Sequence, residues 1–218
     1  MNDFKKHFGA VKLYFALLIT FSIYSNALAQ IDVTQKHKSY DSLPDANLSE
    51  TQLADFKDKA LRKTKALSGY IAIVADKKQS EIQRNRAIEE GIKLFRSESN
   101  IVEVSVLNSP NPPSRYPIRN YFIKLKKLPY AKTTITWFDL YFSTFVKRAD
   151  GRYEGVATIF QRFDGVMKEG WVYKDITQKK IQIILSLKTI KTGDEEKLEW
   201  EVVLGDIEVV GTKAAPEK

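Results

Sequence analysis

The sequence has no cysteine and only two histidines in 218 residues. Without cysteine, the chain has no disulfide bonds, no thiolate metal ligands and no thiol-linked lipid anchor. After an N-terminal leader the only histidine is His37, which lies in a polar lead-in, so the folded region has no Ser-His-Asp triad. Glycine-rich phosphate loops and nucleophile elbows are also missing. These absences argue against metal, nucleotide and serine-hydrolase chemistry, and we expect no cofactor.

A basic start followed by an apolar run predicts a signal peptide over residues 1–29. Three lysines precede the apolar stretch 13–23, which ends near small residues at 27–29. The run is shorter than the roughly 20 residues that a membrane-spanning helix needs, and its length and flanks are those of an export leader. We expect cleavage before Gln30 and an exported product, periplasmic or extracellular, with no membrane span.

Lysine is abundant in the remaining chain. Removing the leader takes away three lysines and one aspartate, which leaves 189 residues with a formal net charge of +6. This length suits one domain that folds without covalent links. Acidic residues are interspersed with the lysines, which argues against nucleic-acid binding. Attraction to anionic lipid head groups or acidic glycans fits the charge better, and the expected partner is a small molecule or a protein.

Residues 30–48 are polar and predict a flexible lead-in. Two capping boxes follow, in which Ser49 pairs with Gln52 and Ser80 pairs with Gln83. Each box precedes apolar residues at helical spacing. The sequence therefore predicts two helices that form a hairpin.

The next segment combines a strand, a loop and a short helix. Alternating valines over residues 101–107 predict a half-buried strand. Three prolines exclude regular strand pairing across residues 109–114. Pro117 suits the first turn of a short helix that ends at Pro129.

From Thr133 onward the apolar period changes to two, which is typical of strands. Apolar residues change parity between Trp137 and Phe142, and Gly205 interrupts the last run, so we expect bulges and a strongly bent sheet. Turns rich in Asp-Gly and Glu-Gly separate four long runs of β-branched and aromatic residues, at 135–147, 153–163, 173–188 and 198–210.

Together these elements predict one α+β domain over residues 49–212 and a disordered tail over 213–218. Its N-terminal helices pack on a strongly bent antiparallel sheet of one short and four long strands. This order resembles the nuclear transport factor two-like, or cystatin-like, superfamily of α+β cones. The phrases at 135–139, 150–153 and 158–163 are also similar to small exported Bacteroidetes proteins of unassigned function. The resemblance implies a concave sheet face but no particular activity, because that fold hosts isomerases, dehydratases, transport factors and binding modules.

The strands carry a set of aromatic residues that would line a pocket on the concave face. Aromatic rings suit an apolar or sugar-like ligand, although they also fill cores, and this second interpretation stays open. Gln161, rather than Arg162, points inward because it shares parity with Phe163. The expected ligand-lining residues are Trp137, Tyr141, Gln161, Phe163, Trp171 and Tyr173.

Asp139 is the candidate catalytic residue. It shares strand parity with Trp137 and Tyr141, and burial among aromatic rings would raise the pKa of its carboxyl toward that of a general base. In the other interpretation Asp139 marks the parity change and faces solvent at a bulge. Asp175 also has a non-catalytic interpretation, as a residue near the start of a strand.

The lack of catalytic motifs favours a non-enzymatic exported domain that binds a ligand or partner in the concave sheet or along an exposed strand. One alternative is a cofactor-free lyase or isomerase that uses Asp139. A second is a structural subunit of a cell-envelope assembly. We also expect a homodimer that pairs through an apolar row on the outer sheet face, formed by Thr136, Phe138, Leu140 and Phe142.

Overall fold

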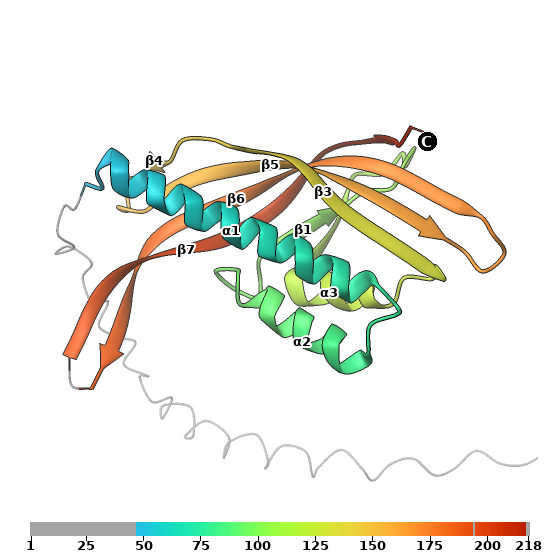
Figure 1. The fold of residues 1–218 in the computed structure, drawn as a ribbon. Coiled ribbons are helices and arrows are strands. Elements are labelled where there is room, and N and C mark those ends of the chain that lie inside the picture. The colour runs from blue at the N-terminus through green and yellow to red at the C-terminus, as the bar shows by residue number, and fades with distance from the viewer. Residues whose placement is uncertain (1–46, 194, 217–218) are drawn as a thin grey trace, which may run out of the picture. The chain divides into compact units, whose positions relative to one another are not determined.

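The computed structural model describes residues 47–193 and 195–216, over which the chain forms three helices and a seven-stranded sheet (Figure 1). This confirms the predicted α+β class with N-terminal helices. The predicted leader and nearly all of the predicted lead-in lie outside the described residues. In chain order the elements are α1 (Glu50–Ala75), α2 (Glu81–Ile92), β1 (Ile101–Val104), β2 (Ser114–Pro117), α3 (Ile118–Lys126), β3 (Lys132–Phe142), β4 (Val146–Lys147), β5 (Tyr153–Val166), β6 (Val172–Thr192) and β7 (Glu195–Ala214).

Both predicted capping boxes are present. The Ser49 hydroxyl accepts a hydrogen bond from the Gln52 backbone N–H at 3.3 Å, and the Gln52 side chain accepts one from the Ser49 N–H at 2.9 Å. Ser80 and Gln83 repeat the arrangement at the start of α2. Each box satisfies backbone N–H groups that would otherwise lack partners at a helix start, and so fixes where α1 and α2 begin.

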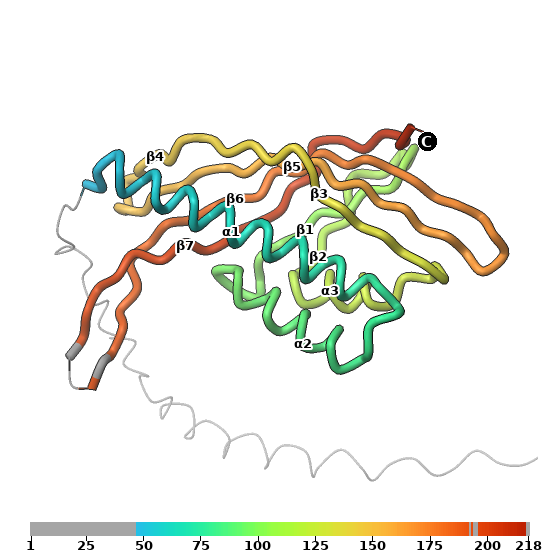
Figure 2. Tube along the Cα trace, in the orientation of Figure 1, coloured from blue at the N-terminus to red at the C-terminus, as the bar shows by residue number. Residues whose placement is uncertain are grey.

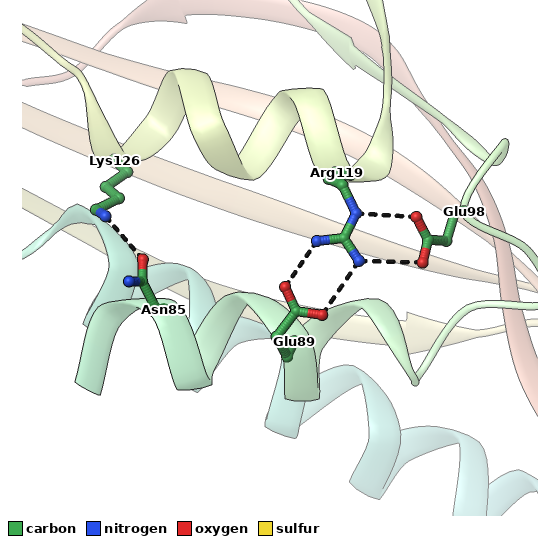
Figure 3. A network of polar contacts seen from close by, with 5 residues as sticks. All are labelled: Asn85, Glu89, Glu98, Arg119 and Lys126. Atoms are coloured by element: carbon green, nitrogen blue, oxygen red, sulfur yellow. Dashed lines mark hydrogen bonds and ion pairs between the residues drawn. The ribbon is translucent and has the colours of Figure 1, made fainter. Parts of the chain in front are cut away.

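An arginine ties α3 to α2 and to the chain before β1. Arg119 donates two hydrogen bonds to the Glu89 carboxylate, at 2.7 and 3.1 Å, and two to the Glu98 carboxylate, at 2.9 and 3.0 Å (Figure 3). At the other end of α3, Lys126 donates to Asn85 at 2.7 Å. Arg119, Glu89 and Glu98 are all more than one third exposed, so their network orients α3 more than it stabilises the fold.

The sheet has the strand order β2-β1-β7-β6-β5-β3, and β4 pairs with β5. All pairs are antiparallel except β1 with β7, which run parallel where Val102 faces Ile207. The structure differs from the expected strands in two places: the predicted run 135–147 is divided into β3 and the short β4, and β2 is an additional short strand. Strand β2 begins at Ser114, the last residue of the segment predicted to be unpaired, because the three prolines precede its first paired residue. At the C-terminus of the domain, β7 continues two residues into the predicted tail and ends at Ala214.

Bulges bend the sheet at both predicted places. In β3 the register with β5 shifts between Phe138 and Tyr141, and Asp139 has a φ of 50°. In β7, Gly205 and Asp206 together lie opposite the single residue Gln182 of β6. An extra residue in one strand increases the local twist and bends the strand.

The helices cover one face of the sheet, which we call the inner face. Figure 2 shows α1 running across the strands, and α1 packs against β3, β7, α2 and α3. Leu67 of α1 and Phe122 of α3 are fully buried against sheet residues such as Ile159, Ile181 and Leu204. Burying a side chain of this size contributes roughly 1.5 to 3 kcal/mol, so this apolar layer is the main source of stability.

The expected outer apolar row is wrong in its second half. Phe138 faces outward, where its ring stacks on Phe160 with centroids 5.8 Å apart. The bulge at Asp139 then changes the parity of the strand, so Phe142 lies opposite the fully buried Ala157 and packs against the core. Leu140 also packs against the core. The parity change that predicts the bulge therefore also splits the row between the two faces.

Candidate functional site

The inner face is polar at one end and apolar at the other. Strand register aligns Trp137, Gln161, Thr177 and Thr212 across β3, β5, β6 and β7. Toward the other end of the sheet, the same face carries isoleucine, leucine and alanine. Six polar residues are buried in the described part of the chain, and five of them form what we call the polar end: Thr133, Gln161, Asp175, Thr177 and Lys179.

Four of the six expected ligand-lining residues lie together at the polar end. Trp137 donates a hydrogen bond from its indole N–H to the Gln161 amide oxygen at 3.1 Å. Phe163 packs edge-on against Tyr173, with ring centroids 5.8 Å apart. Strand parity alone places these four on one face, as expected.

The other two expected residues lie elsewhere. Tyr141 is 62% exposed and lies opposite Thr158, beyond the bulge that changes strand parity. Trp171 is 77% exposed and belongs to the turn between β5 and β6 rather than to a strand. Neither contributes to the polar end.

Asp139 is exposed and occupies the β3 bulge in the left-handed region. The hypothesis of a general base at this position depends on burial among aromatic rings. In the structure, the carboxyl with such surroundings is that of Asp175, which is 5% exposed.

Asp175 lies at the centre of a hydrogen-bonded chain. The Tyr173 hydroxyl donates to Asp175 Oδ2 at 2.8 Å and accepts from the Leu107 backbone N–H at 2.7 Å. The second oxygen, Oδ1, is buried without a hydrogen-bond partner among the described residues. Burial raises the pKa of the Asp175 carboxyl above its usual range, although the Tyr173 hydrogen bond opposes the shift. Burial also raises the pKa of Tyr173 to about 12.

Lys179 is a buried lysine on the same face of β6, only 3% exposed. Its ammonium group donates to the Glu103 carbonyl oxygen at 3.3 Å and lies 5.9 Å from the centroid of the Tyr121 ring. Burial lowers the pKa of Lys179 to about 8, while the charges of Asp175 and Glu103 act in the opposite direction. No carboxylate of the described residues contacts this ammonium group directly, and a buried cation with one long hydrogen bond destabilises the fold.

Aromatic rings cover the polar end. Tyr130 lies directly on Gly165, where a Cβ atom would come within 2.6 to 2.8 Å of three of its ring atoms. The Tyr130 ring also packs edge-on against Phe163, with centroids 5.3 Å apart. A carboxyl, an ammonium and a phenol are groups able to transfer protons, but here they are buried beneath side chains of the protein itself. The polar end is therefore better described as a closed polar cluster than as an open active site.

The sequence contains a signal for this cluster that the initial interpretation missed. Tyr173, Asp175, Thr177 and Lys179 alternate in phase with Ile181, so the parity of β6 places all five on the inner face. The sequence interpretation explains Asp175 as a residue near the start of a strand and does not consider Lys179, since Asp and Lys are seldom buried.

An open groove lies between α1 and the outer part of the β6–β7 hairpin. Its volume is about 390 Å³. Trp200 packs edge-on against Tyr153, with centroids 5.7 Å apart, and borders the groove. We call it the α1 groove. Its lining residues are Lys59, Arg62 and Lys63 from α1, Lys188 and Ile190 from β6, and Glu199, Trp200, Glu201 and Val202 from β7.

Positive charge exceeds negative charge in the α1 groove. The two lining glutamates have cationic partners on the hairpin: Glu201 pairs with Lys188 at 3.4 Å, and Glu199 pairs with Lys197 at 3.1 Å. The three α1 cations have no carboxylate within 4 Å among the described residues. Burial lowers the pKa of Lys63; the nearby charge of Glu201 opposes this shift, and that of Lys188 adds to it. Such cations are available to an anionic ligand.

A second hollow, of about 420 Å³, lies on the outer face between residues 143–148 and strands β5 to β7. Charges of both signs line it. One of its acids, Asp206, is already occupied, since Oδ1 accepts hydrogen bonds from Asn100 and from the Ile101 N–H, both at 2.8 Å. This hollow has no clear preference for a ligand of either charge.

Over the described residues, no three His, Cys, Asp or Glu side chains are grouped so that they could hold a metal ion. No helix of that region combines the length and apolar character needed to cross a membrane.

Comparison with known proteins gives little further information. No family model matches the chain, and no curated protein matches it. Among solved structures, it is similar to the Kfla4162 protein from Kribbella flavida, with 11% identity and a TM-score of 0.39, over 72% of this chain and 95% of that one. A likeness this weak carries no argument, so function has to be inferred from the residues of this chain.

Proposed function

We propose that the chain is an exported, non-enzymatic binding domain that holds an anionic ligand in the α1 groove. The observation that carries this proposal is the group of three α1 cations, Lys59, Arg62 and Lys63, which border the groove with no carboxylate of the described residues within 4 Å. The N-terminal leader in the sequence supports export. The order of helices and strands supports a cone of the nuclear transport factor two-like class.

The groove suggests which chemistry the ligand has. Arg62 offers a planar group of donors that suits carboxylate, sulfate or phosphate, and the two lysines add positive charge. Trp200 and Ile190 provide an apolar surface beside these charges. An acidic saccharide or acidic peptide, with anionic groups next to a ring or an apolar side chain, fits this combination.

Isothermal titration of the chain from residue 30 onward tests the proposal, with a sulfated oligosaccharide and a polyglutamate peptide as anionic probes and an uncharged oligosaccharide for comparison. We expect binding of at least one anionic probe and none of the neutral one. The double change Arg62→Ala and Lys63→Ala should weaken binding by roughly 10-fold or more, because charge-assisted hydrogen bonds are lost. Raising the salt concentration should weaken it further.

A matched control uses cations outside the groove. Lys77→Ala combined with Lys78→Ala removes the same net charge, and both lysines are exposed in the turn after α1 and do not line the groove. This variant should bind like the unchanged protein. Equal weakening in the two double variants would show that only net charge matters and would overturn the assignment of the groove. Failure of both anionic probes to bind would also count against it.

The enzymatic alternative, a cofactor-free lyase or isomerase using Asp139, stays a hypothesis. The burial that it requires belongs to Asp175, which the rings of Tyr130, Phe163 and Tyr173 enclose. Changing Asp139 to Asn and finding any activity of the purified protein unaltered would dispose of it. The envelope-subunit alternative also stays a hypothesis, which reproducible co-purification with envelope proteins would support.

A further inference from the structure

The turn between β5 and β6 presents two large apolar side chains to solvent. Trp171 is 77% exposed, and Val172, the first residue of β6, is 53% exposed. The turn is closed by a hydrogen bond from the Met167 N–H to the Trp171 carbonyl at 2.8 Å and by one from Gly170 to Met167 at 3.2 Å. Gly170 has a φ of +88°, which glycine adopts without strain. The turn is therefore well defined, and Trp171 projects from it.

Lysines surround this apolar tip. Val172 lies opposite Val166, which in turn lies opposite Lys132 of β3, so these three form one row across the sheet. Lys168 is in the turn itself, and Lys174 follows two residues after Val172. No described carboxylate lies within 4 Å of these three lysines. We call the five residues Lys132, Lys168, Trp171, Val172 and Lys174 the β5–β6 tip.

The remaining charges near the tip leave it basic. Glu169 is the only acidic residue between Val166 and Lys174. Asp164 accepts two hydrogen bonds from Arg162, at 2.8 and 3.0 Å, so its charge is neutralised locally. Lys213, opposite Ile176 in β7, adds another exposed cation at the same end of the sheet.

We infer that the β5–β6 tip docks on an anionic lipid surface, with Trp171 and Val172 in the interface and the lysines against the head groups. Tryptophan prefers the interface between water and hydrocarbon, where its ring is buried and its N–H can still find a partner. Lysines that flank such a residue are attracted electrostatically to anionic lipids, whereas neutral lipids offer no such attraction. An apolar tip with a basic surround is complementary to this surface.

Vesicle co-sedimentation tests the inference, with vesicles of phosphatidylcholine alone and with about one third phosphatidylglycerol. We expect binding to the anionic vesicles only, and weaker binding at high salt. Trp171→Ala should reduce the vesicle-bound fraction by roughly 10-fold, since interfacial partitioning scales with buried apolar area. Quenching of tryptophan emission by brominated lipid should be lost in the Trp171→Phe variant, because Trp137 and Trp200 are half-buried away from the tip.

Ile82 provides a matched control, since it is 80% exposed and belongs to α2, which packs on α1 and α3 rather than on β5 or β6. Ile82→Ala should bind vesicles like the unchanged protein. Equal loss in the two alanine variants, or equal binding to neutral and anionic vesicles, would overturn the inference. So would retained binding by Trp171→Ala. Competition by soluble glycerophosphate at millimolar concentration would show an anion site rather than a lipid surface and would overturn it too.

This inference is independent of the proposed function. The Arg62→Ala and Lys63→Ala variant removes cations of the α1 groove and leaves the tip intact, so it should bind anionic vesicles like the unchanged protein. If that variant loses vesicle binding while Trp171→Ala keeps it, the α1 groove rather than the tip is the lipid-binding surface. If the Arg62→Ala and Lys63→Ala variant loses only binding of the anionic probe, and Trp171→Ala loses only vesicle binding, the two surfaces act separately.

Discussion

Tyr173 and Asp175 lie two residues apart on the inner face of β6, and the Tyr173 hydroxyl donates a hydrogen bond to Asp175 Oδ2 at 2.8 Å. The hydrogen bond satisfies one carboxyl oxygen, while Oδ1 is buried without a partner among the described residues. Burial therefore favours the protonated form of the Asp175 carboxyl, whereas the hydrogen bond from Tyr173 favours the charged form.

The first prediction concerns Asp175→Asn. The folded-state pKa of Asp175 is raised, so its contribution to stability is present below the unfolded-state pKa and is lost as the pH rises through the folded-state value. The asparagine variant keeps the hydrogen bond from Tyr173 and does not titrate. Its free energy of unfolding relative to the unchanged protein should therefore rise with pH between pH 4 and 7. Urea unfolding at several pH values measures this, and a difference that does not change with pH would contradict it.

The second prediction concerns Lys179→Met. With the folded-state pKa lowered to about 8, the unfolded chain binds more protons between pH 8 and the usual lysine value. The unchanged protein should therefore gain stability as the pH rises through this interval, and the methionine variant should lack this gain. At pH 7 the variant should be more stable by roughly 1 to 3 kcal/mol, since a buried charge is replaced by an apolar group.

The matched control for this change is Lys180→Met. Lys180 is the exposed neighbour on the outer face, so its replacement should change the free energy of unfolding by less than about 0.5 kcal/mol. A Lys179→Met protein less stable than the unchanged one at pH 7 would show that the ammonium group contributes more through Glu103 and Tyr121 than burial costs.

A third prediction follows from the Tyr130 ring on Gly165. In Gly165→Ala the added methyl group would meet the ring, so the variant should lose about 1 to 3 kcal/mol of stability. In a Tyr130→Ala background the same change should cost much less, since the ring is gone. Gly211→Ala, where a Cβ meets nothing within 4 Å, is the control and should be nearly neutral. Thermal unfolding of the four proteins in a double-mutant cycle gives the coupling, and independent effects would refute the contact.

The β3 bulge gives a fourth prediction. Asp139 has a φ of 50°, which Asp, Asn and Gly adopt readily and a β-branched residue does not. Asp139→Val should therefore destabilise the protein by about 1 to 2 kcal/mol, whereas Asp139→Asn and Asp139→Gly should be nearly neutral. Denaturant midpoints of the three variants test this, and equal midpoints would mean that the bulge rearranges.

The fifth prediction concerns the homodimer expected from the sequence. The exposed stack of Phe138 on Phe160 is the part of the expected row that does face outward. If the outer face pairs two chains, Phe138→Glu should convert a dimer to a monomer in light scattering, while Ile82→Glu should not. If the unchanged protein is a monomer in light scattering, the dimer hypothesis is wrong.

Local features were predicted correctly because their causes lie within a few residues. The boxes at Ser49 and Ser80 fix two helix starts, and the parity change after Trp137 marks a bulge. Strand parity was also enough to bring Trp137 and Gln161 together.

Features that depend on distant parts of the chain could not be predicted in the same way. The burial of Asp175 and Lys179 depends on Leu107, Glu103 and other residues that come from elsewhere in the sequence. The parallel pairing of β1 with β7 joins residues about a hundred positions apart. The α1 groove is lined by residues of a helix and of a distant hairpin, and no local sequence pattern predicts it.

The outer part of the β6–β7 hairpin has a consequence for how the molecules behave in concentrated solution. Beyond Leu185, β6 pairs only with β7, so this ribbon has unpaired backbone along its sides. Lys191 pairs with Glu196 across the ribbon at 2.9 Å, and other lysines and glutamates alternate nearby. A strand of a second molecule that approached this ribbon would have to desolvate these charges, which guards the protein against fibril-like stacking.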